Sequence, residues 1–184
     1  MFKEARIEIG GCLTALVVAF MMMAPQGASA QWSLEARTGA ANPVGDLADA
    51  PGPQEAGLGA AGTLMYTFHP NVTAYGEAAG QWFTCDGCET DALNWGVDGG
   101  LKLLMARDGP LSPWVRAGVA VQQISPEDAD EGEWGVGLDS GVGVDVQVTD
   151  QLAVVPAVRF DTYQATEDLT VSYFTFDLGA HWHP

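Results

Sequence analysis

The sequence predicts an all-β fold, an eight-stranded antiparallel up-and-down transmembrane β-barrel. From residue 31 onward, apolar residues take alternate positions in eight segments, and a period of two is typical of β-strands. The positions between them hold glycine, small polar residues and single charges, as in the interior of a narrow barrel whose apolar side faces lipid. Long and short connections alternate along the chain, which is a third property of membrane barrels.

The segment 134–148 shows the alternation most clearly. It reads WGVGLDSGVGVDVQV, in which nearly every odd place is tryptophan, leucine or valine and the even places are mostly glycine and aspartate. The same alternation predicts strands at 31–38, 57–68, 72–83, 93–104, 114–123, 134–148, 152–163 and 171–183.

The connections indicate how the barrel is oriented. Long and mostly acidic loops are expected at 41–55, 84–92, 125–133 and 164–170, and short turns at 69–71, 107–113 and 149–151. Short periplasmic turns, longer outer loops and an even strand number are usual in the outer membrane. Pro156 lies inside the seventh segment, where its missing N–H predicts a bulge or a local break in the ladder.

The beginning of the chain predicts a cleaved export signal. Basic residues precede the apolar run 11–24, and the small residues 28–30 offer a cleavage site. The apolar run is shorter than the roughly 20 residues of a helical membrane span. We therefore expect a signal peptide at 1–30 and a barrel domain at 31–184, exported to the outer membrane of a Gram-negative bacterium.

The chain is strongly acidic. It carries 24 Asp and Glu residues against 7 Lys and Arg residues, a net charge of −17. This argues against nucleic acid as a partner, because phosphate binding needs a basic surface. The acidic loops suggest instead an interaction with outer-membrane lipid and lipopolysaccharide through divalent cations, since Ca²⁺ and Mg²⁺ prefer carboxylate oxygen ligands.

The alternation directs eleven charged side chains into the barrel. They are Glu35, Arg37, Glu77, Asp98, Lys102, Arg116, Asp139, Asp145, Arg159, Asp161 and Asp177. An eight-stranded barrel is filled by side chains, and buried charges must pair, so we expect a plugged polar lumen with structural ion-pair networks. No internal set of large apolar residues is expected, which argues against a soluble barrel with a ligand cavity.

Aromatic residues are expected in two girdles, because amphipathic rings favour the membrane interfaces. The girdle at the long-loop ends of the strands would contain Trp82, Trp95, Trp134 and Phe174. The girdle at the short-turn ends would contain Trp32, Tyr66, Phe68, Trp114 and Trp182.

Candidate sites are few. Cys85 and Cys88 form a CxxC motif in an outer loop, for which a metal site, a redox dithiol and a local disulfide are open readings; export favours the disulfide. His181 and His183 share one face and His69 lies in a turn at the same end, so three imidazoles could ligate a metal; the second and eighth predicted strands are not adjacent, which argues against that site. Ser172 and His181 lie on opposite faces, so they do not form a nucleophile and base. We expect no cofactor, no metal and no catalytic residue.

Two runs carry a resemblance to a known family: EARTGAANPVGDL in the first strand and YFTFDLGAHW in the last. With the export signal, they make 31–184 similar to the small eight-stranded outer-membrane barrels of the OmpA-like, OmpX-like and opacity-type group. The resemblance implies a membrane barrel. It does not imply one role, because that group includes wall anchors, adhesins, host-contact proteins and a few lipid-modifying enzymes.

The sequence therefore predicts a monomeric outer-membrane barrel with a structural or surface-interaction role, whose surface partner it does not indicate. One alternative is a lipid-modifying enzyme of the outer membrane, which would need a cluster of serine, histidine and an acid at the membrane boundary. Another is a soluble exported barrel that binds a ligand.

Overall fold

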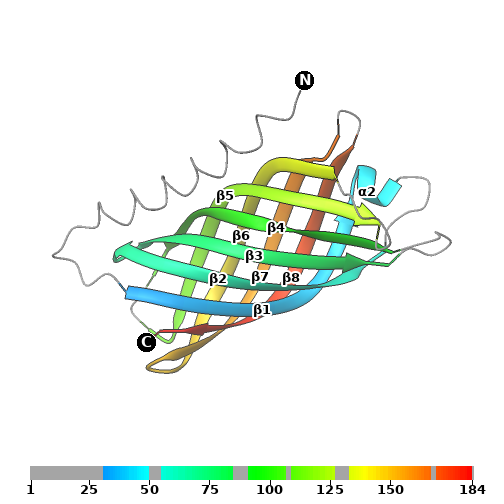
Figure 1. Ribbon diagram of the computed structural model, residues 1–184. Coiled ribbons are helices and arrows are strands. Elements are labelled where there is room, and N and C mark those ends of the chain that lie inside the picture. Colours follow the sequence, from blue (N-terminus) through cyan, green and yellow to red (C-terminus); the bar gives the residue numbers. More distant parts are fainter. Residues whose placement is uncertain are drawn as a thin grey trace. The chain divides into compact units, whose positions relative to one another are not determined.

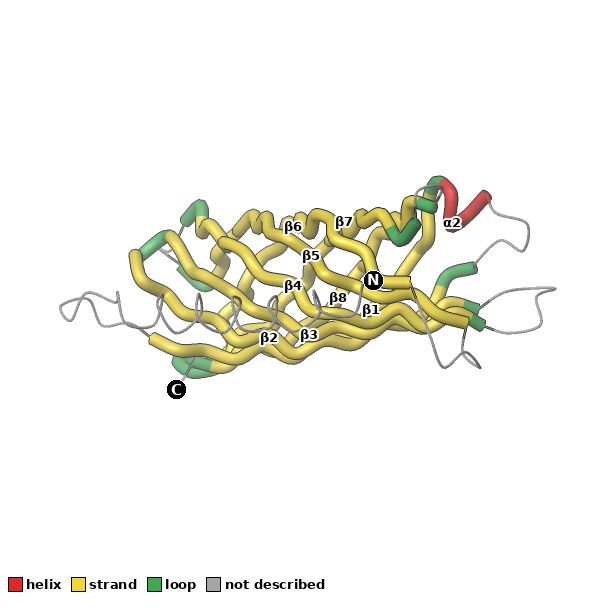
Figure 2. The backbone as a smooth tube through the Cα atoms, turned by 45° about the horizontal axis from the view of Figure 1, so that its top comes forward, coloured by secondary structure: helices red, strands yellow, loops and turns green. Residues whose placement is uncertain are grey.

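The computed structural model is a closed barrel in which every strand pairs antiparallel with its sequence neighbours and the last pairs with the first (Figures 1 and 2). The strands are β1 (Gln31–Val44), β2 (Gly57–His69), β3 (Val72–Phe83), β4 (Ala92–Leu104), β5 (Leu111–Pro126), β6 (Glu133–Thr149), β7 (Leu152–Gln164) and β8 (Thr170–Trp182). The structure describes residues 31–49, 55–84, 91–106, 109–126, 133–166 and 169–183. The barrel confirms the predicted fold class and strand order.

Strands β1 and β5 are longer than predicted, because each contains a proline at a position where only one neighbouring strand pairs with it. The sequence analysis placed 41–55 in a loop, but β1 continues to Val44 and is followed by the short helix α2 (Asp46–Asp49). Pro43 pairs with β8 beyond the point where the β1–β2 pairing ends, so its missing N–H faces an unpaired edge. Pro113 is likewise paired with β6 but lies outside the β4–β5 pairing, which lets β5 begin at Leu111.

Pro156 produces a local break in the ladder without a bulge. The β6–β7 register is the same on both sides of the break, where Gly143 pairs with Ala157 and Val146 with Val154. The two residue pairs between them are missing. On its other side Pro156 keeps its pairing with Leu178 of β8, so the barrel stays closed.

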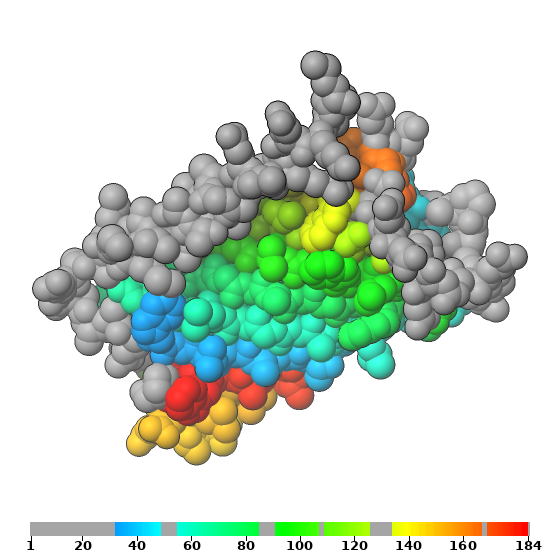
Figure 3. All heavy atoms as spheres, in the orientation of Figure 1, coloured from blue at the N-terminus to red at the C-terminus, as the bar shows by residue number. Residues whose placement is uncertain are grey.

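The outer wall of the barrel is apolar. Leucine, valine and phenylalanine side chains are exposed along the strands, for example Leu138, Val119 and Phe176 at 62%, 53% and 56%. In Figure 3 the atoms of β1 to β4 lie side by side, from blue to green, on the face of the barrel turned to the viewer. Among the described residues there is no helix that is long and apolar enough to cross a membrane.

Both girdles form on the outer wall, with one correction. Exposed tryptophans mark both ends of the strands, and ring pairs such as Trp95 with Trp134 and Trp32 with Tyr66 have centroids 5.1 Å and 4.8 Å apart. Trp114 was expected in the girdle at the short-turn ends, but it is buried in the lumen. It shares the inward direction of Arg116, two residues further along β5, because a strand repeats every two residues.

Candidate functional site

The barrel interior is the candidate site, because it collects the charged residues of the strands. All eleven charges directed inward by the alternation are buried there, with exposures of 8% or less. They fall into groups along the barrel, and neutral polar residues form a further group that the sequence analysis did not identify. Small residues make room for these side chains: a methyl group at Gly118 would collide with the hydroxyl of Tyr75.

Glu77 of β3 is the centre of the first group. Its two carboxylate oxygens accept a bidentate pair of hydrogen bonds from the guanidinium group of Arg37 of β1. They also accept two hydrogen bonds from the guanidinium group of Arg116 of β5, at 3.0 Å and 3.3 Å. Arg159 of β7 donates to the same carboxylate at 2.9 Å, and Thr63 of β2 donates at 2.7 Å. Three guanidinium groups around one buried carboxylate need further negative charge nearby, since unpaired buried charges are strongly unfavourable.

Two aspartates supply that charge. Asp139 of β6 accepts from Arg116 at 2.7 Å and from the hydroxyl of Tyr75. Asp177 of β8 accepts from Arg159 at 2.7 Å and lies 3.4 Å from Arg37. We call this set of six charged residues the arginine layer: Arg37, Glu77, Arg116, Asp139, Arg159 and Asp177. It joins six of the eight strands through three bases and three acids, so its formal charge is balanced.

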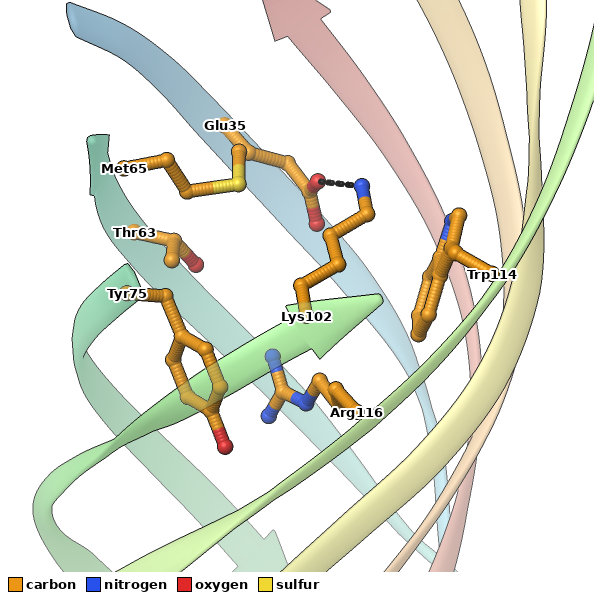
Figure 4. A pocket seen from close by; sticks show the side chains of 7 residues that line it. All are labelled: Glu35, Thr63, Met65, Tyr75, Lys102, Trp114 and Arg116. Atoms are coloured by element: carbon orange, nitrogen blue, oxygen red, sulfur yellow. Dashed lines mark ion pairs between the residues drawn. The ribbon is translucent and has the colours of Figure 1, made fainter. Parts of the chain in front are cut away.

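A second ion-pair group lies at the short-turn end. Lys102 of β4 contacts both carboxylate oxygens of Asp145 at 3.0 Å and lies 4.0 Å from Glu35. Its ammonium group sits 4.6 Å from the ring centre of Trp114, a cation–π distance. Figure 4 shows Glu35, Lys102 and Trp114, with four other side chains, around a cavity of about 10 Å³, which holds about one water molecule. The lumen is therefore filled at this level.

Ser33, His181 and Asp145 form a chain beside this group, which the sequence analysis did not find. His181 Nε2 lies 2.9 Å from Ser33 Oγ, and His181 Nδ1 lies 3.4 Å from Asp145 Oδ2 without the alignment of a hydrogen bond. The order is that of a hydrolase triad, although each side chain is buried. The sequence did indicate that Ser33 points inward, because it lies two residues before Glu35 in the same strand. Ser172 instead contacts the hydroxyl of Thr162 at 2.8 Å.

Neutral polar side chains fill the lumen nearer the long-loop end. Asn94 Nδ2 lies 2.9–3.0 Å from Gln81 Oε1, Gln122 Oε1 and the Tyr173 hydroxyl, which share its two N–H groups, and Asn94 Oδ1 accepts from the hydroxyl of Tyr163 at 2.8 Å. Tyr173 also donates to Gln122 Oε1 at 2.7 Å. We call these five residues the amide–tyrosine layer. Amide and phenol groups occur on inward positions of their strands, but which of them meet depends on the stagger between strands.

The long-loop end of the barrel is closed by apolar side chains, contrary to the expectation that no large apolar set lies inside. Tyr163 and Tyr173 continue into a cluster with Phe83, Val171 and Leu47, the last from α2. The side chains of this cluster are buried, and Phe83 and Val171 have no exposed surface. Most of these side chains occupy inward positions at the strand ends, between the polar layers of the lumen and the loops.

The remaining candidates lie elsewhere. Cys85 and Cys88 lie outside the described residues, so their disulfide stays a prediction. The rings of His181 and His183 are in tilted contact, with centres 4.0 Å apart and an interplanar angle of 46°, and His69 accepts a hydrogen bond from the backbone N–H of Asn71 in its turn. Within the described ranges, no three His, Cys, Asp or Glu side chains come together in a way that could hold a metal ion.

Comparison with solved structures identifies the fold. Neisserial surface protein A has a TM-score of 0.70 and 13% identity over 84% of this chain and 99% of its own. OprG of Pseudomonas aeruginosa has a TM-score of 0.54 and 15% identity over 84% and 97% of the two chains. The chain has the small outer-membrane barrel fold.

A third match with this barrel fold is the N-terminal β-barrel domain of OprF from Pseudomonas aeruginosa, with a TM-score of 0.53 and 16% identity over 85% of this chain and 100% of the domain. No protein-family model and no curated protein matches the sequence. The fold assignment therefore rests on structural similarity and on three properties of the barrel: its strand number, its closure, and its buried charges with apolar side chains outside.

Proposed function

We propose that the protein is an integral barrel of the outer membrane of a Gram-negative bacterium, with a structural or surface-interaction role. The carrying observation is the inverted distribution of polarity: charges are buried inside and large apolar side chains are exposed outside. In water such a wall would be unstable, whereas in a bilayer the closed sheet satisfies its backbone and presents apolar groups to lipid.

A closed lumen supports a role other than conduction. The arginine layer, the amide–tyrosine layer and the apolar cluster follow one another along the barrel, and their side chains contact one another across it. Barrels of eight strands have interiors just wide enough to be filled in this way. Function therefore falls to the surfaces outside the membrane, chiefly the long loops.

The acidic loops support contact with the outer leaflet. We propose that their carboxylates bind lipopolysaccharide through divalent cations, as hard oxygen ligands do. Neisserial surface protein A, which shares the fold, is by its name a surface protein. The long-loop end would then face outward and the short turns the periplasm.

Catalysis is the second candidate, and it rests on the Ser33–His181–Asp145 chain. A hydrolase also needs room for its substrate beside the nucleophile and a donor for the oxyanion. Ser33 is 4% exposed, and the neighbouring cavity holds about one water. We expect no labelling of the folded protein by a fluorophosphonate probe. Labelling that is lost in Ser33→Ala would instead show that Ser33 is an activated nucleophile and would favour the enzyme alternative.

The membrane assignment is tested by one substitution on the outer wall. Val119→Arg places a charge in the apolar band, and we expect it to destabilise the barrel in lipid by about 2–4 kcal/mol if Val119 lies near the midplane. The measurement is urea unfolding in vesicles, together with membrane fractionation and electrophoresis of heated and unheated samples. Val119→Leu is the matched control and should behave as wild type. A protein found in the soluble fraction, with no heat-dependent change in migration, would refute the proposal.

A further inference from the structure

Asp98 of β4 and Asp161 of β7 are buried acids without a counter-charge. Their exposures are 5% and 0%, and neither forms an ion pair with a described residue. The lumen bases pair with the other five inward acids, Glu35, Glu77, Asp139, Asp145 and Asp177. The two remaining acids therefore have no ion-pair partner among the described residues.

One amide group joins the two acids. Gln122 Nε2 donates to Asp98 Oδ1 at 2.9 Å and to Asp161 Oδ1 at 3.5 Å. The second oxygen of each carboxyl group is buried and has no hydrogen-bond partner in the structure. The orientation of the Gln122 amide is fixed by its other end, where Oε1 accepts from Asn94 and Tyr173. The amide thus presents N–H groups, not an oxygen ligand, to the pair.

Other acids lie directly opposite both members of the pair. In the strand ladders Asp98 lies opposite Glu77, and Asp161 lies opposite Asp139, and like charges in that position repel. The charged and titratable groups that face the pair are Glu77 of β3, Arg116 of β5, Asp139 of β6, Arg159 and Tyr163 of β7, and Tyr173 of β8. Both arginines are already bound by the acids of the arginine layer.

We propose that Asp98 and Asp161 form a buried proton-binding site in the folded barrel. A buried carboxyl group without a counter-ion is most easily neutralised by a proton. Each side chain has one oxygen bonded to Gln122 and one oxygen free to carry hydrogen. The inference goes beyond the proposed role, because it concerns the state of the lumen and not what the loops contact.

The site makes the outer half of the lumen sensitive to pH. The pair lies between the arginine layer and the amide–tyrosine layer, and the latter has no base to stabilise new negative charge. Loss of the protons would leave two adjacent unpaired carboxylates beneath the apolar cluster. The expected consequence is weaker packing of the long-loop end as the pH rises.

The test is the pH dependence of urea unfolding in lipid vesicles, followed by tryptophan fluorescence. In the unfolded chain both aspartates are ionised near neutral pH, so folding takes up protons and alkali opposes it. The unfolding equilibrium constant should rise about tenfold per pH unit for each proton that the folded site holds. In Asp98→Asn/Asp161→Asn this contribution should disappear. Glu55→Gln is the control, because Glu55 is an exposed acid outside the lumen and its loss should leave the slope unchanged.

Several results would overturn the proposal. A wild-type protein without this slope, or a double variant that retains it, excludes the site. Added Ca²⁺ that stabilises the wild type at fixed pH, but not the double variant, assigns the pair to a metal cation instead. If the double variant fails to fold, infrared spectroscopy of the wild type decides: a protonated carboxyl band at neutral pH that weakens in Asp98→Asn supports the site, and its absence refutes it.

Discussion

The arginine layer and the amide–tyrosine layer both fill the same narrow lumen with polar groups, by opposite means. The first uses full charges, and its three arginines and three acids neutralise one another across six strands. The second uses neutral amides and phenols whose donors and acceptors match. We therefore expect the charged layer to depend on every member being present and the neutral layer to tolerate the loss of one group.

The largest expected effect is in the arginine layer, at its centre. Glu77→Gln keeps the side-chain shape but leaves three buried guanidinium groups short of one negative charge. We expect the free energy of unfolding to fall by about 3–5 kcal/mol, the usual effect of breaking a buried ion pair from one side. Urea unfolding in vesicles measures it. Glu55→Gln on the surface is the control, expected within about 0.5 kcal/mol of wild type.

An intermediate effect is expected for Arg159→Lys. Arg159 bridges Glu77 and Asp177 with two different nitrogens, 2.9 Å and 2.7 Å from the carboxylate oxygens. Lysine keeps the charge but cannot reproduce this planar fork. We expect a loss of about 1.5–3 kcal/mol, corresponding to one charge-assisted hydrogen bond. If the same unfolding measurement shows no change, the charge alone, and not the geometry, holds the layer together.

The smallest effect is expected in the amide–tyrosine layer. Tyr173→Phe removes the hydroxyl that donates to Gln122, whose oxygen still accepts from Asn94. The loss should be about 1 kcal/mol, that of one neutral hydrogen bond. Tyr66→Phe on the outer wall is the matched control and should change stability less. A loss at Tyr173 as large as that of Glu77→Gln would contradict the contrast between the two layers.

The strands could be predicted from the sequence because a side chain's direction within a strand is a local property. The alternation of side chains separates inward from outward residues along each segment. Applied to Trp114, it would have placed that residue inside the barrel, where it is buried. The partners of Glu77 could not be predicted in this way. They lie 39, 40 and 82 positions away along the chain, and the stagger of the closed barrel decides which inward residues share a layer.

The ends of the strands were also beyond a local pattern. Pro43 ends an alternating run when read alone, yet it lies in β1 because only one neighbour pairs with it there. The apolar cluster was missed for a related reason: Phe83, Tyr163 and Val171 belong to three strands and become a core only when those strands meet. The candidate site was thus predictable in its composition and not in its connections.

Closure of the barrel affects how the chain can fold and insert into a membrane. The pairing of β1 with β8 joins Leu34 to Trp182, which lie near the two ends of the barrel sequence, and contacts so distant in sequence form slowly. Until that seam closes, Arg37 lacks Asp177 of β8, and the half-built wall presents bare edges that a bilayer core does not tolerate. Insertion of single strands into lipid is therefore unfavourable. We expect the open strand edges to be shielded from lipid until β8 pairs with β1.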